Sequence, residues 1–137
     1  MRRIALAALV LLACESAERA EAQRVVAAVD RFRQAQNPDK PAAAEALRAV
    51  PCSAPDVCKA RDTCLVTADT WGRAIRLKNE VEKGLDAIEK GTLAKDSPEA
   101  KELPKKLDEA EALLKEGHDK LQPCDDEVMS LRRKHRF

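Results

Sequence analysis

The chain has 137 residues, of which 36% are Asp, Glu, Lys or Arg, and its formal net charge is +1 at pH 7. This length allows one domain, and the balanced charge argues against a nucleic-acid-binding protein, which would need a strong basic excess. With two Phe, one Trp and no Tyr, the core has to be built from Ala, Leu and Val. Helix is favoured along most of the chain, because few residues outside turns are β-branched or glycine.

The first residues have the features of an export signal. Arg2 and Arg3 precede an uninterrupted apolar run from Ile4 to Ala13, which has the length of a signal-peptide hydrophobic region. At 1.5 Å per residue this run covers about half of the hydrocarbon core of a bilayer, so it is too short to be a permanent span. We predict a signal peptide over residues 1–13 and a single mature domain over residues 14–137.

The residues Leu11-Leu12-Ala13-Cys14 resemble the lipobox of bacterial lipoproteins, where a hydrophobic residue at −3 and a small one at −1 precede the modified cysteine. Leu12 departs mildly from the smaller residue that is usual at −2. The resemblance covers only these residues and implies nothing about the mature domain. It implies that the Cys14 thiol receives a diacylglycerol, that the signal is cut before Cys14, and that the new amino group can take a further acyl chain such as palmitate. Two or three chains would anchor the protein stably in a lipid bilayer.

The alternative is ordinary signal cleavage, which would release a soluble protein. Cleavage after Ala17 or Ala20 would place a glutamate at −3, which is unfavourable, and the better pattern Ala20-Glu21-Ala22 lies far from the apolar run. The residue after the modified cysteine also carries information in the lipoprotein family. Glu15 is not the aspartate that signals inner-membrane retention in enteric lipoproteins, so the resemblance favours the outer membrane of the cell envelope.

The mature chain opens with two predicted helices. The first begins near Ser16, a suitable N-terminal cap, and ends at the turn Asn37–Pro41. A short Ala-rich helix from about Pro41 to Val50 follows, with its proline at the favoured first position. The apolar residues of the first helix recur at helical spacing on one face: Ala22, Val25, Val26, Val29 and Phe32.

A long helix is predicted from the turn bracketed by Pro51 and Pro55 to about Lys90, where Gly91 is a plausible stop. The position of its apolar face changes part-way along. The two apolar stripes are Cys64, Ala68, Trp71 and Ile75, and then Leu77, Val81, Leu85 and Ile88.

The last helical segment starts at Ser97-Pro98-Glu99, which combines a cap, a proline at the first position and an acid in the first turn. Pro104 and Pro123 are expected to kink or interrupt it. Its apolar residues alternate in steps of three and four: Ala100, Leu103, Leu107, Ala110, Leu114, Gly117, Leu121, Cys124, Val128 and Leu131. This pattern is typical of helices packed at a shallow angle. The predicted fold is all-α, a small antiparallel helical bundle built on a long helical hairpin.

Four cysteines remain besides Cys14, and an even number in an exported chain indicates two disulfides. In a hairpin that turns at residues 91–97, Cys64 and Cys124 lie opposite each other, which leaves Cys52 to pair with Cys58. Pairing Cys58 with Cys124 and Cys52 with Cys64 is one or two turns out of register and stays open. A metal site is disfavoured, because zinc ligands are usually separated by two to four residues. Five residues separate Cys52 from Cys58, and five separate Cys58 from Cys64.

No constellation of catalytic residues is evident. His118 and His135 have no partner arrangement that suggests a nucleophile or a metal site, and no Gly-rich phosphate loop or Gly-x-Ser-x-Gly motif occurs. The basic tail 132–136 is read as a solvated helix end, and contact with anionic lipid headgroups or an acidic partner is the less favoured interpretation. We expect neither an enzyme nor a bound cofactor.

The sequence therefore predicts a membrane-anchored lipoprotein of the bacterial cell envelope that acts as a non-catalytic structural or protein-interaction module. Its expected partners are the lipid bilayer, through acylated Cys14, and an envelope protein. Two alternatives stay open. One is a helical lipoprotein that binds a small apolar ligand, and the other is an enzyme. A cavity lined by Leu and Val would favour the first, and a cleft that gathers His118 with carboxylates would favour the second.

Overall fold

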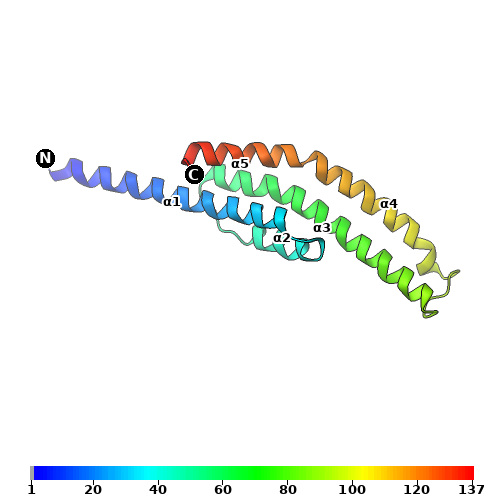
Figure 1. Ribbon diagram of the computed structural model, residues 1–137. Helices are drawn as coiled ribbons and strands as arrows, with labels where there is room; N and C mark the ends of the chain where they lie inside the picture. Colours follow the sequence, from blue (N-terminus) through cyan, green and yellow to red (C-terminus); the bar gives the residue numbers. More distant parts are fainter. Residues whose placement is uncertain (1) are drawn as a thin grey trace.

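The computed structural model describes the backbone of residues 2–137 and the side chains of residues 17–137. Over these residues the chain forms five α-helices and one short 3-10 helix, with no strand: α1 (Arg2–Gln34), η1 (Asn37–Asp39), α2 (Lys40–Arg48), α3 (Pro55–Glu89), α4 (Pro98–Asp119) and α5 (Leu121–His135). The predicted all-α bundle built on a helical hairpin is confirmed (Figure 1). None of the described helices combines the length and the apolar character needed to cross a membrane.

Helix α1 is continuous from the predicted signal segment into the mature domain, so the expected helix start at Ser16 is wrong. No proline or glycine interrupts residues 2–34, and without such a residue an Ala- and Leu-rich helix continues. The predicted buried face of α1 is confirmed. Its members are Ala22, Val25, Val26, Val29 and Phe32, joined by Ala28.

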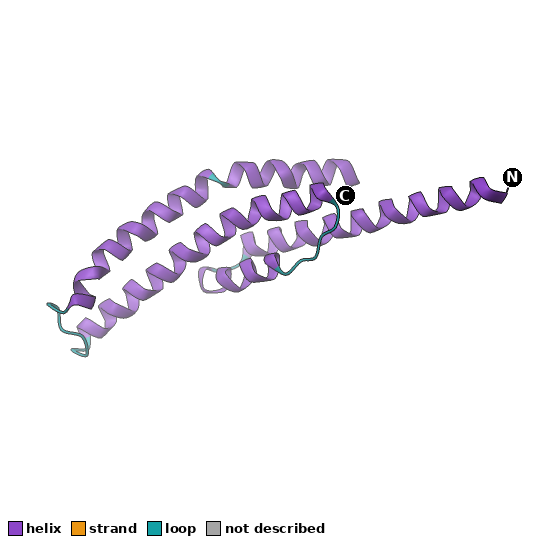
Figure 2. Cartoon of the chain, turned by 180° about the vertical axis from the view of Figure 1, so that it is seen from behind, coloured by secondary structure: helices purple, strands orange, loops and turns teal. Residues whose placement is uncertain are grey.

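After η1, the short helix α2 packs against α1 and α3, and the connection to α3 then runs back to the end of the bundle from which α1 emerges (Figure 2). Ala44 and Leu47 are the apolar residues that α2 buries. Helix α3 begins at Pro55. The residue before it, Ala54, has no side chain that could cap the helix.

Helices α3 and α4 form the antiparallel hairpin. Gly91, at φ 72°, ends α3 in a left-handed turn, in which its amide bonds the carbonyl of Ile88 and the Thr92 amide bonds that of Ala87. Ser97 caps α4 as predicted, since its hydroxyl accepts from the Ala100 amide at 3.1 Å.

Two glycines let the hairpin close. A Cβ on Gly84 would come within 2.6 Å of the Leu103 side chain, and a Cβ on Gly117 within 2.0 Å of the Trp71 indole. In both places a large side chain of one helix lies on the bare backbone of the other. This close approach keeps the two long helices in contact along their shared length.

The expected interruption of the last helical segment occurs at Lys120, between α4 and α5. Pro123 lies four residues after Asp119, and its ring cannot follow a continuous helix there. At this break the Thr67 hydroxyl of α3 donates to the carbonyl of Lys120 at 2.9 Å. Pro104, in contrast, does not end α4, which continues through it.

Beyond the ends of α1 and α2, the hairpin continues as a two-helix extension, which we call the arm (residues 76–114; Figures 1 and 2). Here the expected burial of the apolar stripes is wrong in part. Leu85 is 55% exposed, Leu107 40% and Leu114 42%. Two helices can bury only the side chains directly between them, so residues at the edge of the stripe stay open to solvent.

Candidate functional site

The predicted lipidation residue, Cys14, is part of helix α1. The structure describes its backbone, and the prediction about its side chain lies outside the described residues. Five residues further on, the Arg19 guanidinium donates to the carbonyl of Arg136 at 3.2 Å. Five helical residues rise about 8 Å. The end of α5 therefore lies beside the part of α1 that follows Cys14, and we call this region the anchor end of the bundle.

The start of α3 lies at the same end, where a residue of α1 caps it. Glu21 accepts from the Ser53 amide at 2.8 Å, the Ser53 hydroxyl at 2.6 Å and the Ala54 amide at 3.2 Å. The hydrogen bond from the Ser53 hydroxyl, together with those two amides, lowers the pKa of Glu21. A carboxylate at a helix N-terminus satisfies free amides and complements the helix dipole, which replaces the cap that Ala54 cannot supply.

The basic tail is solvated in part, as expected from the sequence, because Arg133, Lys134 and Arg136 are exposed, but ion pairs also tie it to the bundle. Arg132 pairs with Asp30 at 2.8 Å, and Lys134 pairs with Asp56 at 2.7 Å. The side chain of His135 is only 6% exposed, and its Nε2 lies 3.5 Å from the Asp56 carboxylate. Aspartates on α1 and α3 thus hold the last turn of α5 in place.

The charge on Asp56 reflects these contacts. Burial by itself raises the pKa of this carboxyl, but the hydrogen bond and the charge of Lys134 outweigh it, and the pKa of Asp56 is lowered. In return, the hydrogen bond to Asp56 raises the pKa of Lys134. Both groups are therefore held in their charged forms.

The four cysteines with described side chains form two disulfides, Cys52–Cys58 and Cys64–Cys124. This is the pairing that the hairpin register favours. Cys64 and Cys124 are 2% and 3% exposed, and their Cα atoms are 4.7 Å apart. Cys52–Cys58 closes a small loop over the first turn of α3. With all four sulfurs bonded, none of these cysteines is a thiolate that could ligate a metal or act as a nucleophile.

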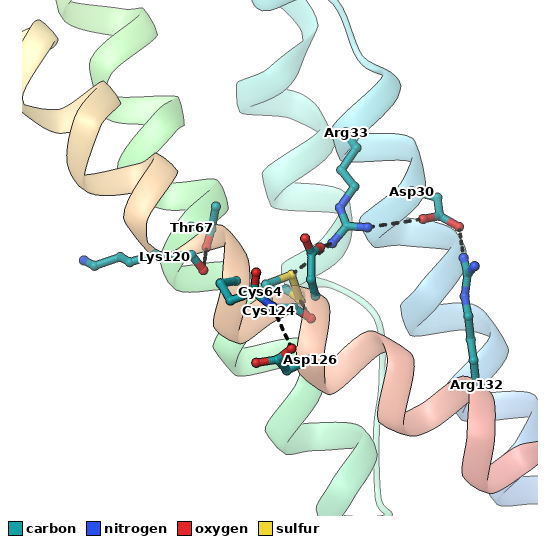
Figure 3. A network of polar contacts seen from close by, with 10 residues as sticks. Asp30, Arg33, Cys64, Thr67, Lys120, Cys124, Asp126 and Arg132 are labelled. Atoms are coloured by element: carbon teal, nitrogen blue, oxygen red, sulfur yellow. Dashed lines mark hydrogen bonds and ion pairs between the residues drawn. A yellow bond between two sulfur atoms is a disulfide. The ribbon is translucent and has the colours of Figure 1, made fainter.

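Polar contacts surround the Cys64–Cys124 bond where α1, α3 and α5 meet (Figure 3). Arg33 of α1 forms an ion pair with Asp125, and the same side chain reaches the Cys124 sulfur at 3.7 Å. Glu127 pairs with Lys59 of α3. The acidic run 125–127 thus provides two cross-helix ion pairs. We call the Cys64–Cys124 bond and these two ion pairs the clamp, because together they hold α1, α3 and α5 in contact.

A buried lysine is the main feature that the sequence did not reveal. Lys40 is 8% exposed, and its Nζ donates to the carbonyls of Phe32 at 3.0 Å and Arg33 at 3.3 Å, at the C-terminal end of α1. The ammonium also lies 4.8 Å from the Phe32 ring centre and 5.4 Å from that of Trp71. Burial lowers the pKa of Lys40. An isolated lysine in an Ala-rich segment gives no sequence signal of such a role.

The described side chains offer little for chemistry. His118 is exposed, and no group of three or more His, Cys, Asp or Glu residues among them could hold a metal ion. Open grooves on the described part of the surface include one of about 310 Å³ and one of about 440 Å³. The smaller is lined by Gln23, Val26, Ala27, Asp30, Arg132 and Phe137. The larger is lined by Arg31, Gln34, Ala35, Asp39, Ala42, Ala43 and Ala46.

No protein-family model, no curated protein and no solved structure matches this chain.

Proposed function

We propose that the chain is a bacterial lipoprotein precursor whose mature domain, anchored through acylated Cys14, is a non-catalytic structural or interaction module of the cell envelope. The observation that carries the proposal is the lipobox-like sequence Leu11–Cys14, placed directly after two arginines and an apolar run. The hydrophobic residue, the small residue and the cysteine are all in the positions that lipid modification requires.

The disulfides support an exported protein. Disulfides persist in oxidising compartments such as the periplasm and are rare in the cytosol. Here every cysteine after Cys14 is in a disulfide, and one of the two bonds joins residues 60 positions apart.

The arrangement of the helices supports an anchored module that extends away from its membrane. The C-terminal turn of α5 and the first turn of α3 both contact α1 shortly after Cys14, through Arg19 and Glu21. From there α3 runs for 35 residues, about 52 Å, to the turn at the tip of the arm. The arm, with its exposed leucines, is the part of the module best placed to meet another envelope protein.

The test is expression of the full chain in a bacterial host with labelled palmitate. Wild-type protein should incorporate the label, enter the detergent phase on phase separation, and lose residues 1–13, so that mass spectrometry finds an acylated Cys14 at its N-terminus. Cys14→Ser should abolish the label and the partitioning. Leu12→Ala is the matched control, because it alters the lipobox toward the smaller residue usual at −2, and it should be lipidated like wild type.

Equal labelling and partitioning of Cys14→Ser and wild type would refute the proposal. An unlabelled protein that begins at Gln23 would instead establish ordinary cleavage after Ala20-Glu21-Ala22. Density-gradient separation of the two membranes then tests the location, with the labelled protein expected in the outer-membrane fraction because Glu15 follows the modified cysteine.

A further inference from the structure

Among the described side chains, the anchor end of the bundle carries arginines that form no ion pair with a carboxylate. The nearby acids Glu21, Asp30 and Asp56 are engaged, by the N-terminus of α3, by Arg33 and Arg132, and by Lys134 with His135, respectively. Among the described side chains, those of Arg19, Arg133 and Arg136 are exposed and form no ion pair, whereas most other arginines of the domain do.

The backbone turns at Arg136, the residue that follows the last residue of α5. Arg136 has φ 53°, and it is the only described non-glycine residue with a positive φ. This turn brings the Phe137 amide to the Arg132 carbonyl at 3.3 Å and places Phe137 in the groove with Val26 and Ala27 of α1. The chain thus folds back at Arg136, although an L-residue with a side chain rarely adopts this conformation.

The distance from the anchor is short. Arg19 follows Cys14 by five residues, about 8 Å of helix, and Arg136 contacts Arg19 directly. At physiological ionic strength the Debye length is also about 8 Å, so charges at this separation from a membrane surface are not fully screened. Glu18 is the remaining described acid of this region, and it acts on Lys134.

We propose that Arg19, Arg133 and Arg136 form a membrane-contacting surface that binds the phosphates of anionic phospholipids in the leaflet that holds the acylated Cys14. This inference rests on the lipid anchor of the proposed function. Guanidinium groups bind phosphate oxygens in a bidentate manner, and each basic residue close to an anionic surface strengthens attachment by roughly five-fold. The surface fixes the orientation of the domain, so that α3 and the arm point away from the bilayer.

The experiment uses lipidated protein purified from the host and reconstituted in vesicles, either of phosphatidylcholine alone or with about 30% phosphatidylglycerol, which gives the surface a negative potential. Amide hydrogen exchange is followed in residues 132–137, at the end of α5. Exchange should be slowed at least about five-fold by the anionic lipid, and the slowing should disappear in 0.5 M salt, where the Debye length is about 4 Å.

The double variant Arg133→Glu/Arg136→Glu should lose the lipid-dependent slowing while it still incorporates labelled palmitate. Arg76→Glu is the matched control, because Arg76 is an exposed arginine on the arm, far from the anchor end, and this variant should behave as wild type. Equal exchange in neutral and anionic vesicles, or equal slowing in the double variant, would overturn the inference. Palmitate incorporation is read separately, so either result leaves the test of the lipid anchor intact.

Discussion

The indole of Trp71 occupies the space where a side chain at position 117 would lie, since a Cβ on Gly117 would approach its ring to 2.0 Å. The ring of Phe32, on α1, also packs against Trp71, with the two ring centres 6.1 Å apart. Two of the three aromatic residues of the chain therefore meet where α1, α3 and α4 converge. The glycine allows the largest side chain of the protein to fill this junction.

We expect Gly117→Ala to lower the free energy of unfolding by about 1–3 kcal/mol, as overpacking in a close-packed interior does. Gly72→Ala is the matched control. It adds the same methyl group inside α3, where the nearest neighbouring atom is the end of the Arg76 side chain at 3.6 Å. There the gain in helix propensity should stabilise the protein by up to about 1 kcal/mol. Urea denaturation without reductant measures both, and equal effects of the two substitutions would contradict the packing argument.

The two disulfides should differ in their contribution to stability. Cys64–Cys124 joins residues 60 apart, and Cys52–Cys58 joins residues 6 apart. In the chain-entropy model, replacing the first pair by alanine should cost about 4 kcal/mol and replacing the second about 2 kcal/mol. The measurement is the urea midpoint of each double variant. A larger loss from the Cys52/Cys58 variant would show that local structure at the start of α3 outweighs the clamp between α3 and α5.

Because Lys40 is buried, the free energy of unfolding should vary with pH in the alkaline range. Burial lowers its pKa in the folded protein, so between that lowered value and the value of about 10.4 in the unfolded chain the folded state binds fewer protons. The free energy of unfolding contributed by this residue therefore rises as pH increases through this window. Lys40→Met should remove that rise and cost about 1 kcal/mol at pH 7 through the lost bonds to two carbonyls. Parallel pH profiles of wild type and variant would refute the prediction.

Asp56 should affect the free energy of unfolding in the acidic pH range. Its pKa is lowered in the folded protein, so its contribution to stability is fully present above the unfolded value of about 3.9 and is lost as pH falls through the folded value. Asp56→Asn should cost less than about 1 kcal/mol at pH 7, because the pair with Lys134 is partly exposed. The difference between wild type and variant should shrink toward pH 2. Urea midpoints at pH 7 and pH 2 test this, and a constant difference would show that the charge of Asp56 contributes nothing.

Much of the fold could be predicted because helices of this composition leave periodic traces in the sequence. The steps of three and four from Ala100 onward, the cap at Ser97 and the stop at Gly91 all depend on local geometry, and each lies where the pattern placed it. The hairpin register then followed from counting residues on either side of the turn. That register was sufficient to favour the bond between Cys64 and Cys124.

The sequence by itself thus determined most of the helices and the hairpin and favoured the cysteine pairing that forms, and it supplied the lipobox-like segment from which the anchor at Cys14 is proposed. Only the tertiary structure decided which apolar residues stay exposed and which charges are used. Leu85, Leu107 and Leu114 have the same periodicity as their buried neighbours, but α1 and α2 end before they could cover the arm. The packing of Lys40 against Trp71, the capping of α3 by Glu21 and the fixing of the basic tail by Asp56 each join residues distant in the chain. Local propensity contains no information on such contacts, because they exist only once the helices have packed.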